Sequence, residues 1–234
     1  MKEYIEGKLI FGLVILTILP TFSQFVANLF QNYGIGLALR VLVHIIFPIY
    51  FVANVRNINL KESLLIPLQF KKKKKEIIKY GIIGATGAFT IIFGIFLILK
   101  DIIDFSAIGI SLKEGYGVTA TNYSFIALAI IIINPFLEEY FWRGFVFRVF
   151  FEKTKFKFHL VVAYLSGILF SIHHIIIITG WFNWWQFSIV TFFLGLVGIG
   201  FNWLYVKTES IWTSWFIHTI ADIVIVGIGF IVLF

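Results

Sequence analysis

Two adjacent glutamates and an arginine lie in a segment that otherwise has the composition of a membrane helix. Glu138 and Glu139 are followed by Arg143, and the stretch 125–137 before them contains one polar side chain, Asn134. An ionised group at membrane depth costs about 2.5–3.5 kcal/mol on insertion scales, so such groups indicate a functional site. Glu139 and Arg143 are four residues apart and can pair on one helix face. Glu138 projects about 100° away and can face another element.

Other apolar segments contain imidazole groups and a further carboxylate. His174 lies in one segment, and His218 and Asp222 lie four residues apart in another, so this pair shares a helix face. A carboxylate can take a proton from a water that a histidine holds, and a second histidine can stabilise the resulting oxyanion. The same residue types can instead hold Zn²⁺, with Glu138, His174 and His218 as ligands and water completing the site. Both the glutamate–histidine mechanism and the zinc site are suited to hydrolysis.

Each of these polar residues also has a structural interpretation, an interhelical ion pair or hydrogen bond. For His173 this is the role we expect, because neighbouring residues on a helix point in different directions. Arg40 and His44, again four apart, are expected to be structural or to line a cavity.

The composition identifies a membrane protein. Hydrophobic residues make up 60% of the chain and charged residues 13%, and the mean hydropathy is +0.97. A soluble domain of this size would expose more charge. The net charge of +7 does not indicate nucleic acid as a partner, because five of the basic residues form the run Lys71–Lys75 beside apolar segments, a pattern typical of membrane flanks. Cysteine is absent, which excludes disulfides and thiol chemistry.

Apolar stretches near the length of about 20 residues that a bilayer requires predict an all-α, polytopic helical bundle of about seven transmembrane helices. The predicted helices cover residues 9–30, 34–53, 77–99, 122–147, 159–179, 186–206 and 211–231. With the N-terminus cytoplasmic, fifteen of the 19 basic residues fall on the inner side, as the positive-inside rule requires. We therefore expect a multi-pass protein of the cell membrane.

Within this bundle, the motif-bearing residues are concentrated in the second half of the chain. We expect residues 1–121 to form N-terminal transmembrane helices and loops, and residues 122–234 to form a catalytic core in the same membrane domain. Pro135 removes a backbone hydrogen bond just before the glutamates and is expected to kink that helix. Such breaks are tolerated where the backbone is buried in protein or lines a wet cavity.

Three motifs in this half resemble those of the CPBP (Abi) intramembrane proteases, which include the CAAX prenyl endopeptidases. Glu138 to Arg143 resembles the EExxxR motif, Phe170 to His174 resembles FxxxH, and His218 to Asp222 resembles HxxxN/D. The resemblance covers residues 122–231, and the motifs occur in the family's order, each in a predicted helix.

The resemblance implies a peptidase and assigns roles to these residues. Glu138 would activate water, His174 would position it, and His218 with Asp222 would form the oxyanion site. Glu139, Arg143 and Phe170 would have supporting roles. Many members carry Asn where this chain has Asp222, and an ionised Asp cannot donate to an oxyanion. Asp222 would serve there only if protonated; otherwise it would orient His218 or bind metal.

The sequence thus predicts a membrane endopeptidase that cuts a peptide or membrane-protein substrate near the bilayer surface. We favour a glutamate mechanism without a cofactor, with zinc as the alternative. Two other functions remain open. One is a catalytically inactive relative that acts as a membrane scaffold or bacteriocin-immunity protein. The other is a proton-coupled transporter, which is disfavoured because the chain has no inverted repeat.

Overall fold

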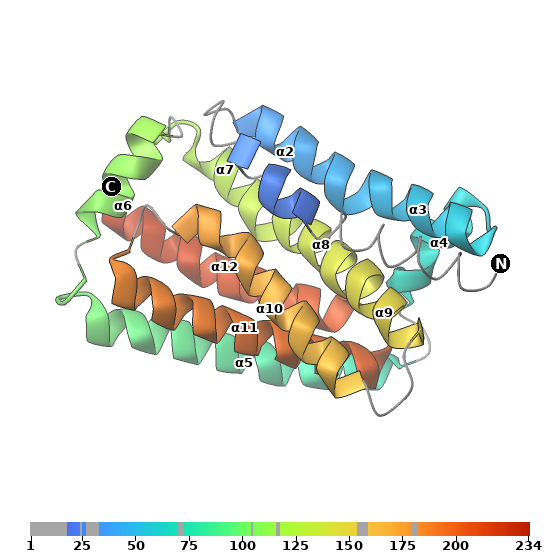
Figure 1. Cartoon of the computed structure of the whole chain (residues 1–234). Helices are drawn as coiled ribbons and strands as arrows, with labels where there is room; N and C mark the ends of the chain where they lie inside the picture. Colours follow the sequence, from blue (N-terminus) through green and yellow to red (C-terminus); the bar gives the residue numbers. More distant parts are fainter. Residues whose placement is uncertain are drawn as a thin grey trace.

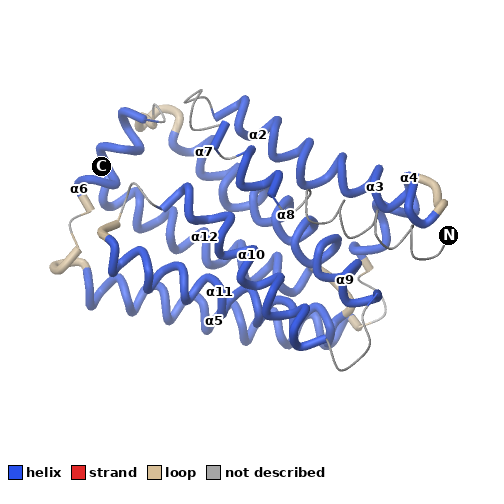
Figure 2. Tube along the Cα trace, in the orientation of Figure 1, coloured by secondary structure: helices blue, strands red, loops and turns tan. Residues whose placement is uncertain are grey.

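The computed structural model describes residues 18–23, 25–26, 33–69, 73–103, 105–115, 118–153, 159–178 and 182–234, and its regular elements within them are all helical. In chain order they are α2 (Tyr33–Val41), η1 (Leu42–Ile46), α3 (Phe47–Arg56), α4 (Leu60–Leu65), η2 (Ile66–Leu68), α5 (Lys74–Leu99), α6 (Ser106–Ile110), η3 (Ser111–Gly115), α7 (Tyr123–Leu128), η4 (Ala129–Ile133), α8 (Asn134–Glu139), η5 (Tyr140–Phe147), α9 (Arg148–Lys153), α10 (His159–Ile178), α11 (Trp184–Thr208) and α12 (Trp212–Leu233). The predicted all-α class is confirmed (Figure 2).

Five helical stretches in the described part of the chain are long and apolar enough to cross a bilayer. They are Gly34–Asn54, Lys74–Leu99, Tyr123–Glu152, Trp184–Thr208 and Trp212–Leu233. The apolar part of α10, Leu160–Ile175, is shorter. The predicted first helix, 9–30, lies largely outside the described residues. The chain is therefore a multi-pass membrane protein, while the count of seven and the orientation stay predictions.

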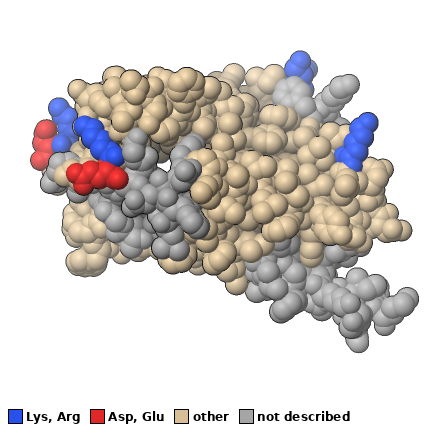
Figure 3. Space-filling model, turned by 90° about the horizontal axis from the view of Figure 1, so that it is seen from above, with Lys and Arg blue, Asp and Glu red and all other residues tan. Residues whose placement is uncertain are grey.

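The helices run side by side in an elongated bundle (Figure 1). In that view α2 and α3 form one edge and α5 the other, with α8, α10 and α12 between them. α10 packs along α11, and α12 packs along α5. On the face drawn in Figure 3, charged side chains of the described residues lie toward the two ends and the broad middle is uncharged. This distribution matches a bundle whose middle meets hydrocarbon.

The helix that carries the tandem glutamates is continuous from Tyr123 to Lys153 but alternates between α and π winding. Two π-helical segments, η4 and η5, flank the short α8. The N–H of Asn134 bonds the carbonyl of Ala129, five residues back, and the next residue, Pro135, has no N–H to donate. The interruption expected at this proline takes the form of a π turn, a feature common at functional sites.

Helices α10 and α11 approach closely at a pair of glycines. A Cβ on Gly198 would lie 2.9 Å from the Cα of Gly167, and one on Gly167 would lie 2.9 Å from the backbone N of Ile199. Small residues at such a crossing let the backbones of membrane helices touch, which provides the van der Waals packing that holds them together. This crossing fixes the position of α10, the helix that carries His174.

Replacing Gly198 by alanine should therefore destabilise the bundle. The added methyl group meets backbone atoms, and overpacking of this kind costs about 1–3 kcal/mol. Gly200 is a matched control on the same helix, because a Cβ there would have no neighbour within 4 Å. Thermal unfolding in detergent should show a lower Tm for Gly198→Ala than for Gly200→Ala. Equal Tm values would contradict the close packing.

Candidate active site

The Glu138 side chain is buried in the bundle, with 2% of the residue exposed. Its two carboxyl oxygens have different surroundings. Oε1 accepts a hydrogen bond of 2.9 Å from the side-chain Nδ2 of Asn134, one turn earlier. Oε2 is buried and has no hydrogen-bond partner among the described residues. A buried carboxylate oxygen of this kind requires a donor or a cation, so Oε2 marks the place where a ligand or solvent molecule fits.

His174 points a second acceptor atom at this oxygen. Its Nδ1 lies 2.8 Å from the carbonyl oxygen of Phe170, and because a carbonyl only accepts, Nδ1 must carry the proton. In the neutral ring Nε2 then has a lone pair, and this atom lies 3.5 Å from Glu138 Oε2. Two acceptors that face each other are compatible with a water that donates to both, or with a metal ion between them.

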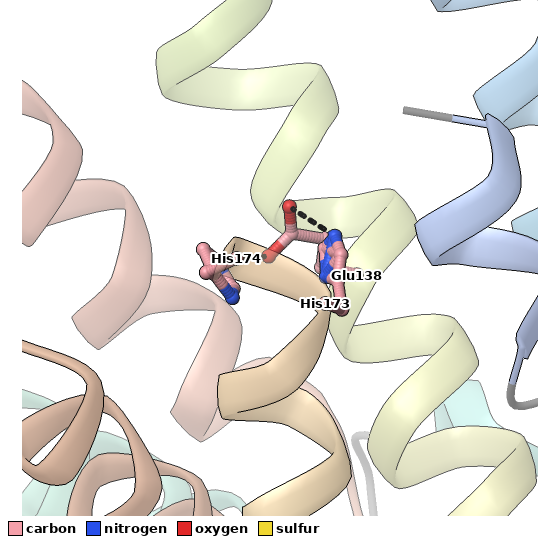
Figure 4. A group of neighbouring side chains, drawn as sticks. All are labelled: Glu138, His173 and His174. Atoms are coloured by element: carbon pink, nitrogen blue, oxygen red, sulfur yellow. Dashed lines mark ion pairs between the residues drawn. The ribbon is translucent and has the colours of Figure 1, made fainter. Parts of the chain in front are cut away.

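His173 also lies against the Glu138 carboxyl group, contrary to the expectation that it points elsewhere. Its Nε2 lies 3.8 Å from Glu138 Oε1, while its neighbour His174 faces Oε2. Figure 4 shows the carboxyl group over α10 with the two imidazoles beneath it. Both histidines reach Glu138, although they diverge from one helix, because one carboxyl group offers two oxygens.

Glu139 and Arg143 form the ion pair that their spacing predicted. Arg143 Nη1 donates to Glu139 Oε1 at 2.9 Å, and both side chains are almost fully buried. Arg143 Nη2 donates to the carbonyl of Gly198 at 3.4 Å. The guanidinium also stacks between two rings, 4.2 Å from the centre of Phe170 and 4.9 Å from that of Phe201. The predicted supporting residue Phe170 is thus a packing partner of the pair.

His218 of α12 is oriented by the second glutamate. Its Nδ1 lies 3.0 Å from Glu139 Oε1, and since Glu139 is paired with Arg143 and accepts, Nδ1 donates. The other ring nitrogen, Nε2, lies 3.9 Å from Glu138 Oε2 and 3.9 Å from Asp222 Oδ1. The ring therefore directs one nitrogen into the space between Glu138 and Asp222. Each residue assigned to the site from the sequence lies in this cluster.

The geometry also fits a metal ion, but with a different third ligand from the predicted one. Donor atoms of Glu138, His173 and His174 lie within 4.8 Å of one another. A carboxylate with two imidazoles and one water is a donor set that suits Zn²⁺. The sequence placed His218 in this set instead of His173. The group whose donor atoms lie within 4.8 Å of one another contains His173, and His218 Nε2 lies 3.9 Å from Glu138 Oε2.

Two further residues reach the site without having been assigned to it. Asn134 donates to Glu138, and Arg40 of α2 donates through Nη1 to the Oδ1 of Asn134. The spacing of four between Asn134 and Glu138 was a signal for the first contact. No sequence signal connects Arg40 with Asn134, because 94 residues separate them.

Fold and site together define a class, the polytopic helical membrane proteins with a buried glutamate–histidine centre. A family model described as type II CAAX prenyl endopeptidase Rce1-like matches residues 120–224, a little under half of the chain. No curated protein and no solved structure matches the chain. The matched segment contains all three motifs, so residues 120–224 are similar to the Rce1-like family, and the predicted resemblance is confirmed over these residues.

Breaking the buried ion pair should lower the free energy of unfolding of the bundle. Glu139→Gln and Arg143→Met each leave an uncompensated buried charge, which costs about 3–5 kcal/mol. The double variant should lose less than the sum of the two, because it removes both charges. A denaturant titration of each variant gives its free energy of unfolding, and the losses in the two single variants are compared with the loss in the double variant. The exposed Glu76 on α5 provides the control Glu76→Gln, and strictly additive losses would argue against the pair.

Proposed function

We propose that this protein is an intramembrane endopeptidase in which Glu138 activates water. The observation that carries this proposal is a pair of acceptors 3.5 Å apart, the buried Glu138 Oε2 and Nε2 of the partly exposed His174 ring. A water molecule has two protons and can donate one to each acceptor. The Rce1-like family match supports peptide-bond hydrolysis as the reaction.

In the proposed reaction, Glu138 Oε2 takes a proton from the bound water while His174 Nε2 holds the other. The water oxygen attacks the carbonyl carbon of the scissile bond and forms a tetrahedral intermediate. The intermediate collapses when the C–N bond breaks, and the protonated Glu138 returns its proton to the leaving amine. The products are one new carboxylic acid, which keeps the second water proton until it ionises, and one new amine, so the glutamate ends in its starting form.

We assign to His218 the role of donating a hydrogen bond to the oxyanion of the tetrahedral intermediate. Its Nδ1 is engaged by Glu139, so its N–H at Nε2 exists in the doubly protonated ring, whose charge the neighbouring carboxylates compensate. That N–H is directed toward the same space as Glu138 Oε2. Asp222, 3.9 Å from Nε2, is assigned to orienting His218, because an ionised carboxylate cannot donate to an oxyanion.

The proposed catalytic core is residues 122–234, and its substrate is a peptide or membrane protein that reaches the site within the bilayer. The broad uncharged middle of the face drawn in Figure 3 supports the membrane setting. The zinc alternative would use Glu138, His173 and His174 as ligands, and the bound ion would supply Lewis-acid activation of the water.

Glu138→Gln should abolish hydrolysis while the protein remains folded. The amide keeps the size of the side chain but cannot take a proton, and loss of general-base catalysis lowers rates by about 10²–10⁴-fold. The purified protein is incubated in ¹⁸O-labelled water with membrane proteins from the producing cells and with an S-farnesylated CAAX peptide. Mass spectrometry then counts peptides with a new ¹⁸O-labelled C-terminus.

The control is Glu76→Gln, on the exposed first turn of α5, which should hydrolyse like the wild type. New labelled termini that persist at the wild-type rate in folded Glu138→Gln would eliminate the proposed base. Their absence with the wild type would favour the inactive scaffold or immunity protein instead.

Removal of metal should leave the activity intact. In the proposed reaction the base is a carboxylate and the oxyanion donor is the imidazolium of His218, so no step needs a metal ion. The protein is dialysed against a strong chelator, its metal content is measured by mass spectrometry, and hydrolysis is assayed in chelator. Activity that disappears and returns on addition of Zn²⁺ would replace the glutamate mechanism with the zinc alternative.

A further inference from the structure

We infer that Arg40, in an N-terminal helix, positions the catalytic glutamate through Asn134. This inference rests on the proposed function of Glu138 as the base. Arg40 Nη1 of α2 donates to Asn134 Oδ1, and Asn134 Nδ2 donates to Glu138 Oε1 at 2.9 Å. The three side chains form a relay that starts outside the family-matched segment 120–224.

Arg40 determines how the Asn134 amide is oriented in this relay of hydrogen bonds. A guanidinium only donates hydrogen bonds, so it must face the oxygen of the Asn134 amide. The amide NH₂ then has to point the other way, toward Glu138, where it acts as a donor. If the amide flipped, its oxygen would face the carboxylate oxygen and its NH₂ would face the guanidinium, and both contacts would be repulsive.

The consequence is that the two oxygens of Glu138 become unequal. Oε1 is held by Asn134, which fixes the rotation of the carboxyl group. Oε2 is thereby directed toward His174 Nε2 and His218 Nε2, at 3.5 and 3.9 Å. Without the relay the carboxyl group could turn and bring neither oxygen into the water-holding position. Arg40 is therefore a positioning residue that acts on Glu138 through Asn134.

The local packing fixes the helix that carries Arg40. His44, one turn later, donates from Nδ1 to the backbone carbonyl oxygen of Arg40 at 2.9 Å, which holds the His44 ring against its own helix. The His44 ring is buried, with 1% of the residue exposed, and packs edge-on against Phe141 at 5.1 Å between centroids. Segment η1, which contains His44, contacts both α8 and η5. The N-terminal helices thus complete the site rather than only surround it.

The test is a double-mutant cycle on Arg40→Met and Asn134→Ala, with kcat and KM measured separately. Each single variant should lower kcat on the order of 10- to 100-fold, the usual effect of removing an outer-shell partner, with KM little changed. The double variant should be no slower than the slower single variant, because both act through the same bond. Arg40→Lys retains a donor and should recover part of kcat.

A matched control is Lys79→Met, which removes an exposed cation from α5 and should change neither constant. Thermal unfolding confirms that each variant is folded. Multiplicative losses of kcat in the double variant, or Arg40→Met with unchanged kcat, would overturn the inference. A raised KM with unchanged kcat would also overturn it, because positioning of the base acts on the chemical step.

An infrared measurement separates failure of this inference from failure of the proposed function. The carboxyl bands of Glu138, taken as the difference between the wild type and Glu138→Gln, report its hydrogen bonds without any substrate. We expect Arg40→Met and Asn134→Ala to shift these bands in the same way. A shift in a protein that hydrolyses nothing would support the relay and reject the protease, whereas active protein with unshifted bands would reject the relay.

Discussion

The ion pair between Glu139 and Arg143 is the contact on which the rest of the site depends. Arg143 joins the glutamate-bearing helix to α11 through the Gly198 carbonyl and to α10 through the Phe170 ring. Glu139 in turn receives His218 from α12. One charge left without its partner in this interior would cost several kcal/mol. The pair therefore favours the one arrangement of four helices in which both charges are compensated.

The tandem glutamates are anchored by two arginines in two different ways. Glu139 meets Arg143 directly and uses one oxygen both for that pair and for His218. Glu138 is connected to Arg40 through the Asn134 amide, which binds Oε1 and leaves Oε2 for chemistry. Direct pairing neutralises Glu139, whereas the Asn134 amide holds Glu138 by Oε1 and leaves Oε2 directed at His174 and His218. The two neighbours can thus have different roles in one buried site.

Two π-helical segments allow this arrangement within a single helix. A π turn holds one more residue than an α turn, so it shifts the register of every side chain beyond it. Segments η4 and η5 lie on either side of α8, which carries both glutamates. The close crossing of α10 and α11 at Gly167 and Gly198 then sets where the α10 histidines meet that helix.

The sequence by itself determined the helical membrane class, because apolar segments of bilayer length have few other solutions. It also determined the Glu139–Arg143 pair, since residues four apart on a helix are neighbours in any fold. Only the tertiary structure decided which oxygen of Glu138 meets which histidine, that His173 lies at the site, and that Arg40 reaches Asn134. Those contacts join residues far apart in the chain, and helix packing and side-chain rotation set them, which periodicity does not encode.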